Sequence, residues 1–202
     1  MATRLFLIRH GETRWSLTGQ HTGRTDLPLT KNGEDRAAAL RGPLAEVAFS
    51  HVLTSPLQRA RQTCELAGFG AVAQVDRNLQ EWNYGDYEGR TTADIRTVRP
   101  RWNVFEDGCP GGESADQIAR RADEVLARLR AMEGTAALFS HGQFLRVLAV
   151  RWIGLPVREA LHFALDTASV SILGHNGEIP VLALWNAGAD AGFPTLPREG
   201  RP

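Results

Sequence analysis

The sequence has almost no lysine, few cysteines and no long hydrophobic run, and its opposite charges cancel. With 23 basic and 23 acidic residues, the formal net charge at pH 7 is zero. Neither a nucleic-acid partner nor a polybasic membrane anchor is therefore expected. No apolar stretch reaches bilayer-spanning length, and the first residues lack the basic start and cleavage site of a signal peptide. We expect a cytoplasmic protein with no membrane partner. The sequence leaves open whether the protein forms a homo-oligomer.

The scarcity of cysteine and the spacing of histidine argue against a bound metal. Cys64 and Cys109 stand far apart without Cys-x-x-Cys spacing, which is typical of small buried side chains or free thiols in a reducing compartment. The six histidines form no His-x-His, His-Glu-x-x-His or mixed Cys/His cluster. We therefore expect no metal and no other cofactor.

Lys31 is the single lysine, so the basic residues are otherwise all arginine. The planar guanidinium suits phosphate and carboxylate groups. Genomic base composition explains most of this preference for arginine over lysine. Only the arginines that a motif places in a binding site bear on function.

Strands alternate with helices along the chain. Apolar runs at 4–8, 51–54 and 136–140 predict buried strands, and runs at 169–174 and 179–185 around an Asn-Gly pair predict a hairpin. Helices are expected after Thr30, from Pro56 (capped by Ser55) to about Ala67, through the apolar stripe of 115–132, and over 143–153.

This order indicates an α/β three-layer sandwich, in which a mainly parallel sheet with an antiparallel strand carries helices on both faces. Residues 1–202 are expected to form one domain. An insertion at about 82–112 would cover the site, and a loose tail would begin at about residue 186.

Two apolar strands run directly into His-Gly pairs, at His10 and at His141. A parallel sheet brings both histidines to the edge where ligands bind. Arg9 precedes the first histidine, and Arg59 lies near a helix start, which itself favours an anion. Each residue alone is more often a turn or surface residue, but together they predict an electropositive pocket for phosphate.

Six segments in order resemble the histidine phosphatase superfamily, also called the phosphoglycerate mutase-like fold. They cover most of the chain from Leu5 to about Trp152, and they read LIRHGET, HTGRTDLPLTKNG, SPLQRARQT, LQEWNYGDYEG, CPGGES and FSHGQFLR. The resemblance is to the phosphatase branch, which includes broad-specificity acid phosphatases and sugar-bisphosphate phosphatases.

The resemblance implies a role for each pocket residue. His10 would be the nucleophile that forms a phosphohistidine, and Arg9 and Arg59 would clamp the phosphoryl oxygens. His141 would help to hold the phosphoryl group. Glu81 would protonate the leaving oxygen and later activate water. Substrate contacts would come from Ser16, Thr22, Gly23, Trp82, Tyr84, Gly142 and Gln143.

Ser16 departs from the mutase-type motif, which has asparagine at that position, and a hydroxyl reaches less far. The chain is short for a mutase, and RTTAD follows YGDYEG where a mutase-type motif carries lysine. These features favour a phosphomonoester hydrolase acting on small phosphorylated metabolites.

Two alternatives stay open. Four insertion arginines could bind an acidic substrate in a cofactor-dependent phosphoglycerate mutase, namely Arg90, Arg96, Arg99 and Arg101. A pseudo-enzyme that binds phosphate esters or a protein is the alternative of another class.

Overall fold

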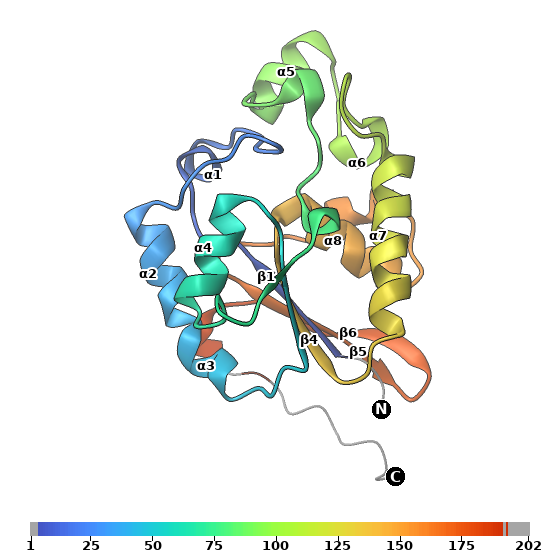
Figure 1. Ribbon diagram of the computed structural model, residues 1–202. Coiled ribbons are helices and arrows are strands. Elements are labelled where there is room, and N and C mark those ends of the chain that lie inside the picture. The colour runs from blue at the N-terminus through green and yellow to red at the C-terminus, as the bar shows by residue number, and fades with distance from the viewer. Residues whose placement is uncertain (1–3, 192, 194–202) are drawn as a thin grey trace.

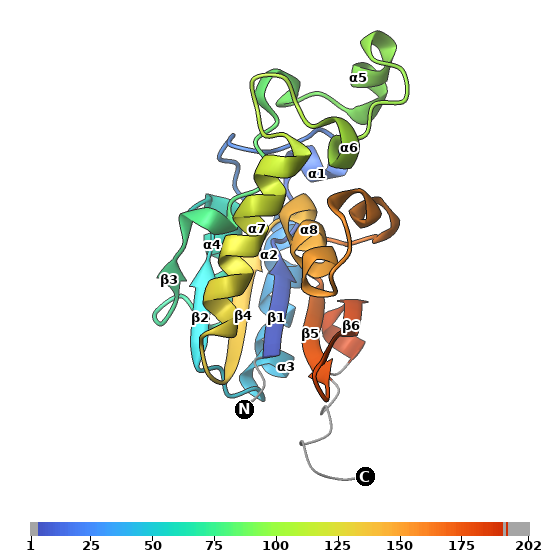
Figure 2. The same cartoon turned by 90° about the vertical axis from the view of Figure 1, so that its right-hand side faces the viewer.

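The computed structural model describes residues 4–191 and 193. Its centre is a six-stranded sheet (Figure 1). The strand order is β3-β2-β4-β1-β5-β6 (Figure 2). The first four strands in this order are mutually parallel, and β5 is antiparallel to both of its neighbours. The strands are β1 (Arg4–Arg9), β2 (His51–Thr54), β3 (Gln74–Val75), β4 (Thr135–Ser140), β5 (Val170–Asn176) and β6 (Ile179–Ala187).

Helices cover both faces of the sheet, with α7 and α8 on one side and α2, α3 and α4 on the other (Figure 2). The helices are α1 (Arg14–Thr18), α2 (Lys31–Ala39), α3 (Arg41–Ala45), α4 (Gln58–Leu66), α5 (Thr92–Val98), α6 (Val104–Asp107), α7 (Ala115–Arg130) and α8 (Gly142–Trp152). The predicted three-layer α/β sandwich is confirmed. Among the described residues, no helix combines the length and the apolar character needed to cross a membrane.

The apolar sequence of β1 explains why both layers of helices form. Successive side chains of a strand point to opposite faces. Leu5 and Leu7 therefore join the core beneath α7 and α8, whereas Phe6 and Ile8 join the core beneath α2, α3 and α4. A strand that is buried on both faces holds the residue at its end in a fixed position.

The stripe predicted for 115–132 forms α7. Its buried side chains include Ile118, Ala122 and Val125, and Ser114 begins the helix with a capping box. Thr30 caps α2 as predicted, by accepting from the Gly33 N–H at 3.0 Å.

The start of α4 differs from the prediction. The helix begins at Gln58 rather than Pro56, and its first N–H donates to Asp26 Oδ1 at 2.6 Å. The Ser55 hydroxyl still accepts from the Leu57 N–H at 3.3 Å, as well as from His141 Nε2 at 2.7 Å. Ser55 therefore holds the turn that leads into α4, and Asp26 from a distant loop binds the first N–H of the helix itself.

The C-terminal hairpin has a shorter loop than predicted, because β5 continues to Asn176. Asn176 still pairs with Ile179, so the loop is Gly177-Glu178, with φ of Gly177 at +60°. Strand β6 continues to Ala187, and 189–191 form a short 3-10 turn, so the expected tail starts later than residue 186. The rest of that tail, apart from residue 193, lies outside the described residues.

The insertion predicted at 82–112 contains short helical pieces, including α5 and α6. They lie with α1 beyond the carboxyl ends of β1 and β4 (Figure 2).

Candidate active site

A cavity of about 190 Å³ opens at the carboxyl ends of β1 and β4. Its lining draws on the loop after β1, the start of α8 and the insertion. The lining residues are Arg9, His10, Ser16, Gly19, Gln20, His21, Thr22, Glu81, Tyr84, Gly142, Gln143, Arg146 and Leu165.

His10 presents one defined nitrogen to this cavity. Its Nδ1 lies 2.7 Å from the carbonyl oxygen of Gly11, an atom that can only accept, so Nδ1 carries the ring proton. The Nε2 lone pair is left for chemistry. The Gly11 N–H donates to Thr63 Oγ1 at 2.9 Å, and this bond ties the turn to α4.

The surroundings keep the His10 ring neutral. Burial lowers its pKa well below 6.5, and the positive charges of Arg59 and Arg9 lower the pKa further. A neutral imidazole is the form that can attack phosphorus.

Arg9 lies beside the nucleophile at the end of β1. Its Nη1 donates to the carbonyl of Leu165, while its buried Nε has no hydrogen-bond acceptor among the described residues. A Cβ at position 142 would come within 3.2 Å of this Nε, so Gly142 gives the guanidinium its room. A buried donor without a protein acceptor suits an anionic ligand.

His141 and Arg59 are both fully buried and lie behind His10 rather than in the cavity lining. Arg59 Nε can only donate, so His141 Nδ1 accepts this bond at 3.1 Å. His141 Nε2 then carries the proton and donates to Ser55 Oγ at 2.7 Å. The His10 and His141 ring centroids are 5.2 Å apart. Burial and then Arg59 lower the pKa of His141 well below 6.5.

Three further N–H donors of Arg59 bind backbone. Its Nη1 donates to Thr25 O at 3.0 Å, and its Nη2 donates to the carbonyls of Thr22 and Gly23. In this arrangement Arg59 supplies positive charge from behind His10 instead of presenting an open fork to a ligand.

Glu81 forms the wall opposite these cations and is 5% exposed. Its Oε1 accepts from the N–H groups of Trp82 and Phe144, both at 2.9 Å, and its Oε2 accepts from the Gln143 N–H at 3.0 Å. The carboxylate thus caps the N-terminus of α8, where backbone dipoles favour an anion. These donors fix its orientation at the cavity wall.

Comparison with known proteins decides the family. A family model described as "Histidine phosphatase superfamily (branch 1)" matches residues 5–188. The chain belongs to this superfamily.

Relatives within the histidine phosphatase superfamily include named phosphatases. An acid phosphatase of Mycobacterium tuberculosis is 43% identical over 185 residues, which cover 90% of this chain and 91% of that protein. A sedoheptulose 1,7-bisphosphatase of Saccharomyces cerevisiae is 37% identical over 193 residues, covering 79% of this chain and 70% of that protein. The solved structure of an open reading frame from Mycobacterium tuberculosis matches with a TM-score of 0.88 and 40% identity, covering 93% of this chain and 98% of the other.

These findings confirm the family and the fold expected from the sequence motifs. This histidine phosphatase is a hydrolase of phosphate monoesters. Both named relatives fit the phosphatase branch that the motifs resemble.

The residues expected to contact substrate divide into two groups. Five of them line the cavity: Ser16, Thr22, Tyr84, Gly142 and Gln143. Ser16 Oγ is already bonded to the loop, since it accepts from the Thr13 N–H and donates to the Thr13 carbonyl. Its only proton is therefore used locally in the α1 capping box.

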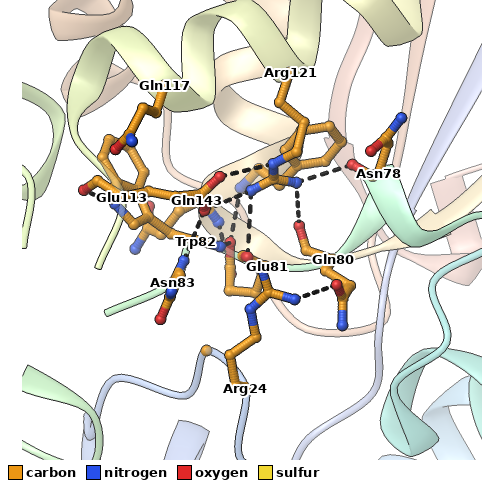
Figure 3. A network of polar contacts seen from close by, with 12 residues as sticks. Arg24, Asn78, Gln80, Glu81, Trp82, Asn83, Glu113, Gln117, Arg121 and Gln143 are labelled. Carbon is orange, nitrogen blue, oxygen red and sulfur yellow. Dashed lines mark hydrogen bonds and ion pairs between the residues drawn. The ribbon is translucent and has the colours of Figure 1, made fainter. Parts of the chain in front are cut away.

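Trp82, which was expected to contact substrate, does not line the cavity. The indole is fully buried, packs against Phe105 and donates from Nε1 to the Glu113 carbonyl at 2.9 Å (Figure 3). Gly23 is also outside the lining, and a Cβ there would come within 2.5 Å of the Trp82 carbonyl. Both residues support the wall from behind.

Sequence reasoning missed Arg146 and His21 in the lining. Arg146 lies one helical turn after Gln143 and donates to Gln143 Oε1 at 2.7 Å, so helical spacing from Gln143 could have indicated it. His21 stacks on Tyr84 with 4.6 Å between ring centroids. Burial lowers the pKa of His21 to about 4.

The four insertion arginines considered for an acidic substrate do not line the cavity. Arg90 donates to the Asp94 carbonyl, Arg96 to the Trp102 carbonyl and Arg99 to Asp107. Arg101 is exposed. Within residues 4–191 and 193, no three His, Cys, Asp or Glu residues are grouped so as to hold a metal ion.

Proposed function

We propose that this hydrolase removes phosphate from small phosphorylated metabolites through a phosphohistidine formed on His10. The observation that carries the proposal is the buried, neutral His10 ring, whose Nδ1 is occupied by the Gly11 carbonyl. The cavity of about 190 Å³ supports a small substrate. The buried free thiols of Cys64 and Cys109 support a reducing compartment such as the cytoplasm.

In the first half-reaction, His10 Nε2 attacks phosphorus and the ester P–O bond breaks. The Arg9 guanidinium stabilises the charge on the phosphoryl oxygens, and the Arg59 charge supports it from behind His10. A proton from the Glu81 carboxyl group goes to the leaving oxygen, so an alcohol departs instead of an alkoxide.

In the second half-reaction, the Glu81 carboxylate takes a proton from water. The resulting oxygen nucleophile attacks phosphorus, the P–N bond breaks and inorganic phosphate leaves. The electron pair returns to His10 Nε2, and Glu81 is again protonated. The cycle consumes one ester and one water and needs no external oxidant, reductant or metal.

The test is phosphate release in the presence of chelator, measured for wild type and for His10→Ala. The substrates are sugar phosphates, sugar bisphosphates and 3-phosphoglycerate. We expect His10→Ala to lower kcat/KM by about 10³-fold or more, because the nucleophile is lost. Acid-labile phosphate on the quenched wild-type protein, absent from the variant, would identify the intermediate.

Three outcomes would overturn the proposal. Full activity of His10→Ala would exclude the phosphohistidine. Conversion of 3-phosphoglycerate to 2-phosphoglycerate without phosphate release would favour a mutase. Tight binding of esters without any turnover would favour a pseudo-enzyme.

A further inference from the structure

Glu81 lies in a stretch of chain without helix or strand. The short 3-10 turn at Arg77–Leu79 ends just before it, and another begins only at Gly85. Three backbone N–H groups orient its carboxylate, but no regular helix or strand fixes the segment of chain that carries it. Other contacts must hold that segment.

Arg121 of α7 supplies these contacts on the N-terminal side of Glu81. Its Nη1 donates to the carbonyls of Asn78 at 2.9 Å and Gln80 at 2.7 Å, and its Nη2 lies 3.3 Å from the Glu81 carbonyl (Figure 3). The guanidinium carbon also lies 4.4 Å from the ring centroid of Phe144, whose N–H binds Glu81 Oε1.

Glu113 holds both Arg121 and the chain on the other side of Glu81. Its carboxylate accepts from Arg121 Nε at 2.9 Å and from Nη2 at 2.8 Å. The same carboxylate accepts from the Asn83 N–H at 2.8 Å, and the Glu113 carbonyl accepts from the Trp82 indole. The ion pair thus binds residues 78–83 at both ends, Arg121 at the N-terminal end and Glu113 at the C-terminal end.

We propose that the Arg121–Glu113 pair is a positioning device for the proton transfer by Glu81. The inference rests on the proposed function, because it assumes that Glu81 protonates the leaving oxygen. Neither side chain lines the cavity, so both act through Glu81 rather than on the substrate.

The geometry of the pair explains why this task falls to an arginine. Its planar fork serves a carboxylate on one edge and backbone carbonyls on the other, which a lysine ammonium cannot do. The two side chains are only 12% and 15% exposed, so removing one partner leaves the other buried without its bonds. The segment would then relax, and a shift of about 1 Å in a catalytic group costs on the order of 10²-fold.

The experiment compares two leaving groups in Arg121→Lys and Glu113→Gln. An alkyl phosphate such as glycerol phosphate needs its leaving oxygen protonated, whereas p-nitrophenyl phosphate releases a stable phenolate without help. The readout is kcat/KM, which reports the first half-reaction alone. We expect about a 10- to 100-fold loss on the alkyl phosphate and less than about a 5-fold loss on the aryl phosphate.

Arg128→Gln is the matched control. Arg128 is an exposed residue of the same helix, and its ion pair goes to Asp76 rather than to residues 78–83. We expect both substrates to retain wild-type kcat/KM. Thermal unfolding of every variant checks that the fold is retained, and the near-isosteric Glu113→Gln provides a second route if Arg121→Lys unfolds.

Glu81→Gln separates the inference from the function on which it rests. Selective loss on the alkyl phosphate is expected for this variant too. Equal loss on both substrates in Glu81→Gln would remove the proton-transfer role and the inference with it. Glu81→Gln could instead lose activity selectively on the alkyl phosphate while the Arg121 and Glu113 variants lose activity equally on both substrates, or on neither. That result would overturn the positioning role and leave the proton transfer by Glu81 in place.

Discussion

At the scale of single residues, one hydrogen bond decides which nitrogen of His10 reacts. The Gly11 carbonyl accepts a hydrogen bond from Nδ1–H, and two arginine charges oppose a second proton on Nε2. The strand positions the ring, the turn orients it, and the cations keep it neutral. These three effects come from residues within a few positions of His10 and from residues of α4.

This arrangement makes a prediction about protonation. As pH falls from 8 to 5.5, the His10 ring should stay neutral, because its folded pKa lies well below 6.5. Histidine ring carbon shifts in the ¹³C-labelled protein would show this directly, with the signal assigned by its loss in His10→Gln. A His10 titration midpoint near 6.5 would contradict the electrostatic account.

At the scale of elements, the start of α2 is pressed against the loop that follows His10. A Cβ on Gly33 would come within 2.2 Å of the Glu12 carbonyl, and one on Gly11 within 2.5 Å of the Gly33 carbonyl. Thr30 strengthens the contact through its N–H and hydroxyl, which donate to the Glu12 carbonyl and carboxylate. Two backbones meet here without room for a side chain.

We therefore expect Gly33→Ala to lower the free energy of unfolding by about 1–3 kcal/mol, because backbone atoms must move to admit the methyl group. The same movement should displace the Gly11 carbonyl and reduce kcat/KM. Gly42→Ala in α3 is the control, since nothing lies within 4 Å of its added Cβ. Because Pro43 follows and opposes the helical gain of an alanine, the free energy of unfolding should change by less than about 1 kcal/mol. Urea unfolding would measure both changes, and equal stabilities for the two variants would refute this argument.

The elements differ in how far the sequence could predict them. Helix α7 and strands β1 and β4 have strong local patterns, and each was predicted within about two residues. The start of α4 was also predicted within two residues, but the partner of its first N–H was not, because Asp26 lies 32 positions away in the sequence. No local pattern could have indicated that contact.

The candidate site shows the same division. His10, Arg9 and His141 follow from strands that end at one sheet edge. The roles of Glu81 and Trp82 came only through family resemblance, and Trp82 packs inward because Phe105 and Glu113 meet it. The position of Arg121 depends on three segments that only the folded chain brings together, so no local pattern could have indicated it.

At the scale of the whole molecule, three buried or partly buried histidines are held neutral. Burial comes first among the causes for His10, His21 and His141, and the pKa of His21 is lowered to about 4. In the unfolded chain each would titrate near 6.5. Between the folded and unfolded pKa values the unfolded state binds more protons, so stability falls as pH falls below about 6.5.

We expect the free energy of unfolding to decrease steadily from pH 6.5 to pH 5, and to change little from these groups above pH 7.5. His21 alone accounts for about 3 kcal/mol once pH reaches its folded pKa. Urea titrations at several pH values would measure the slope. His21→Gln should lower this slope by an amount that corresponds to up to one bound proton per molecule. An unchanged slope in that variant would contradict a lowered pKa for His21.

The site also joins parts of the chain that are remote in sequence, and this has a consequence for folding kinetics. Arg59 binds His141 across 82 positions, and Glu81 caps α8 across 62. Contacts of such long range form late and slowly, because the intervening chain must first lose its freedom. No partly folded form that lacks the β1–β4 pairing can hold His10 beside His141. Catalysis should therefore return during refolding only with the last cooperative step, which makes turnover itself a stringent gauge of the native state.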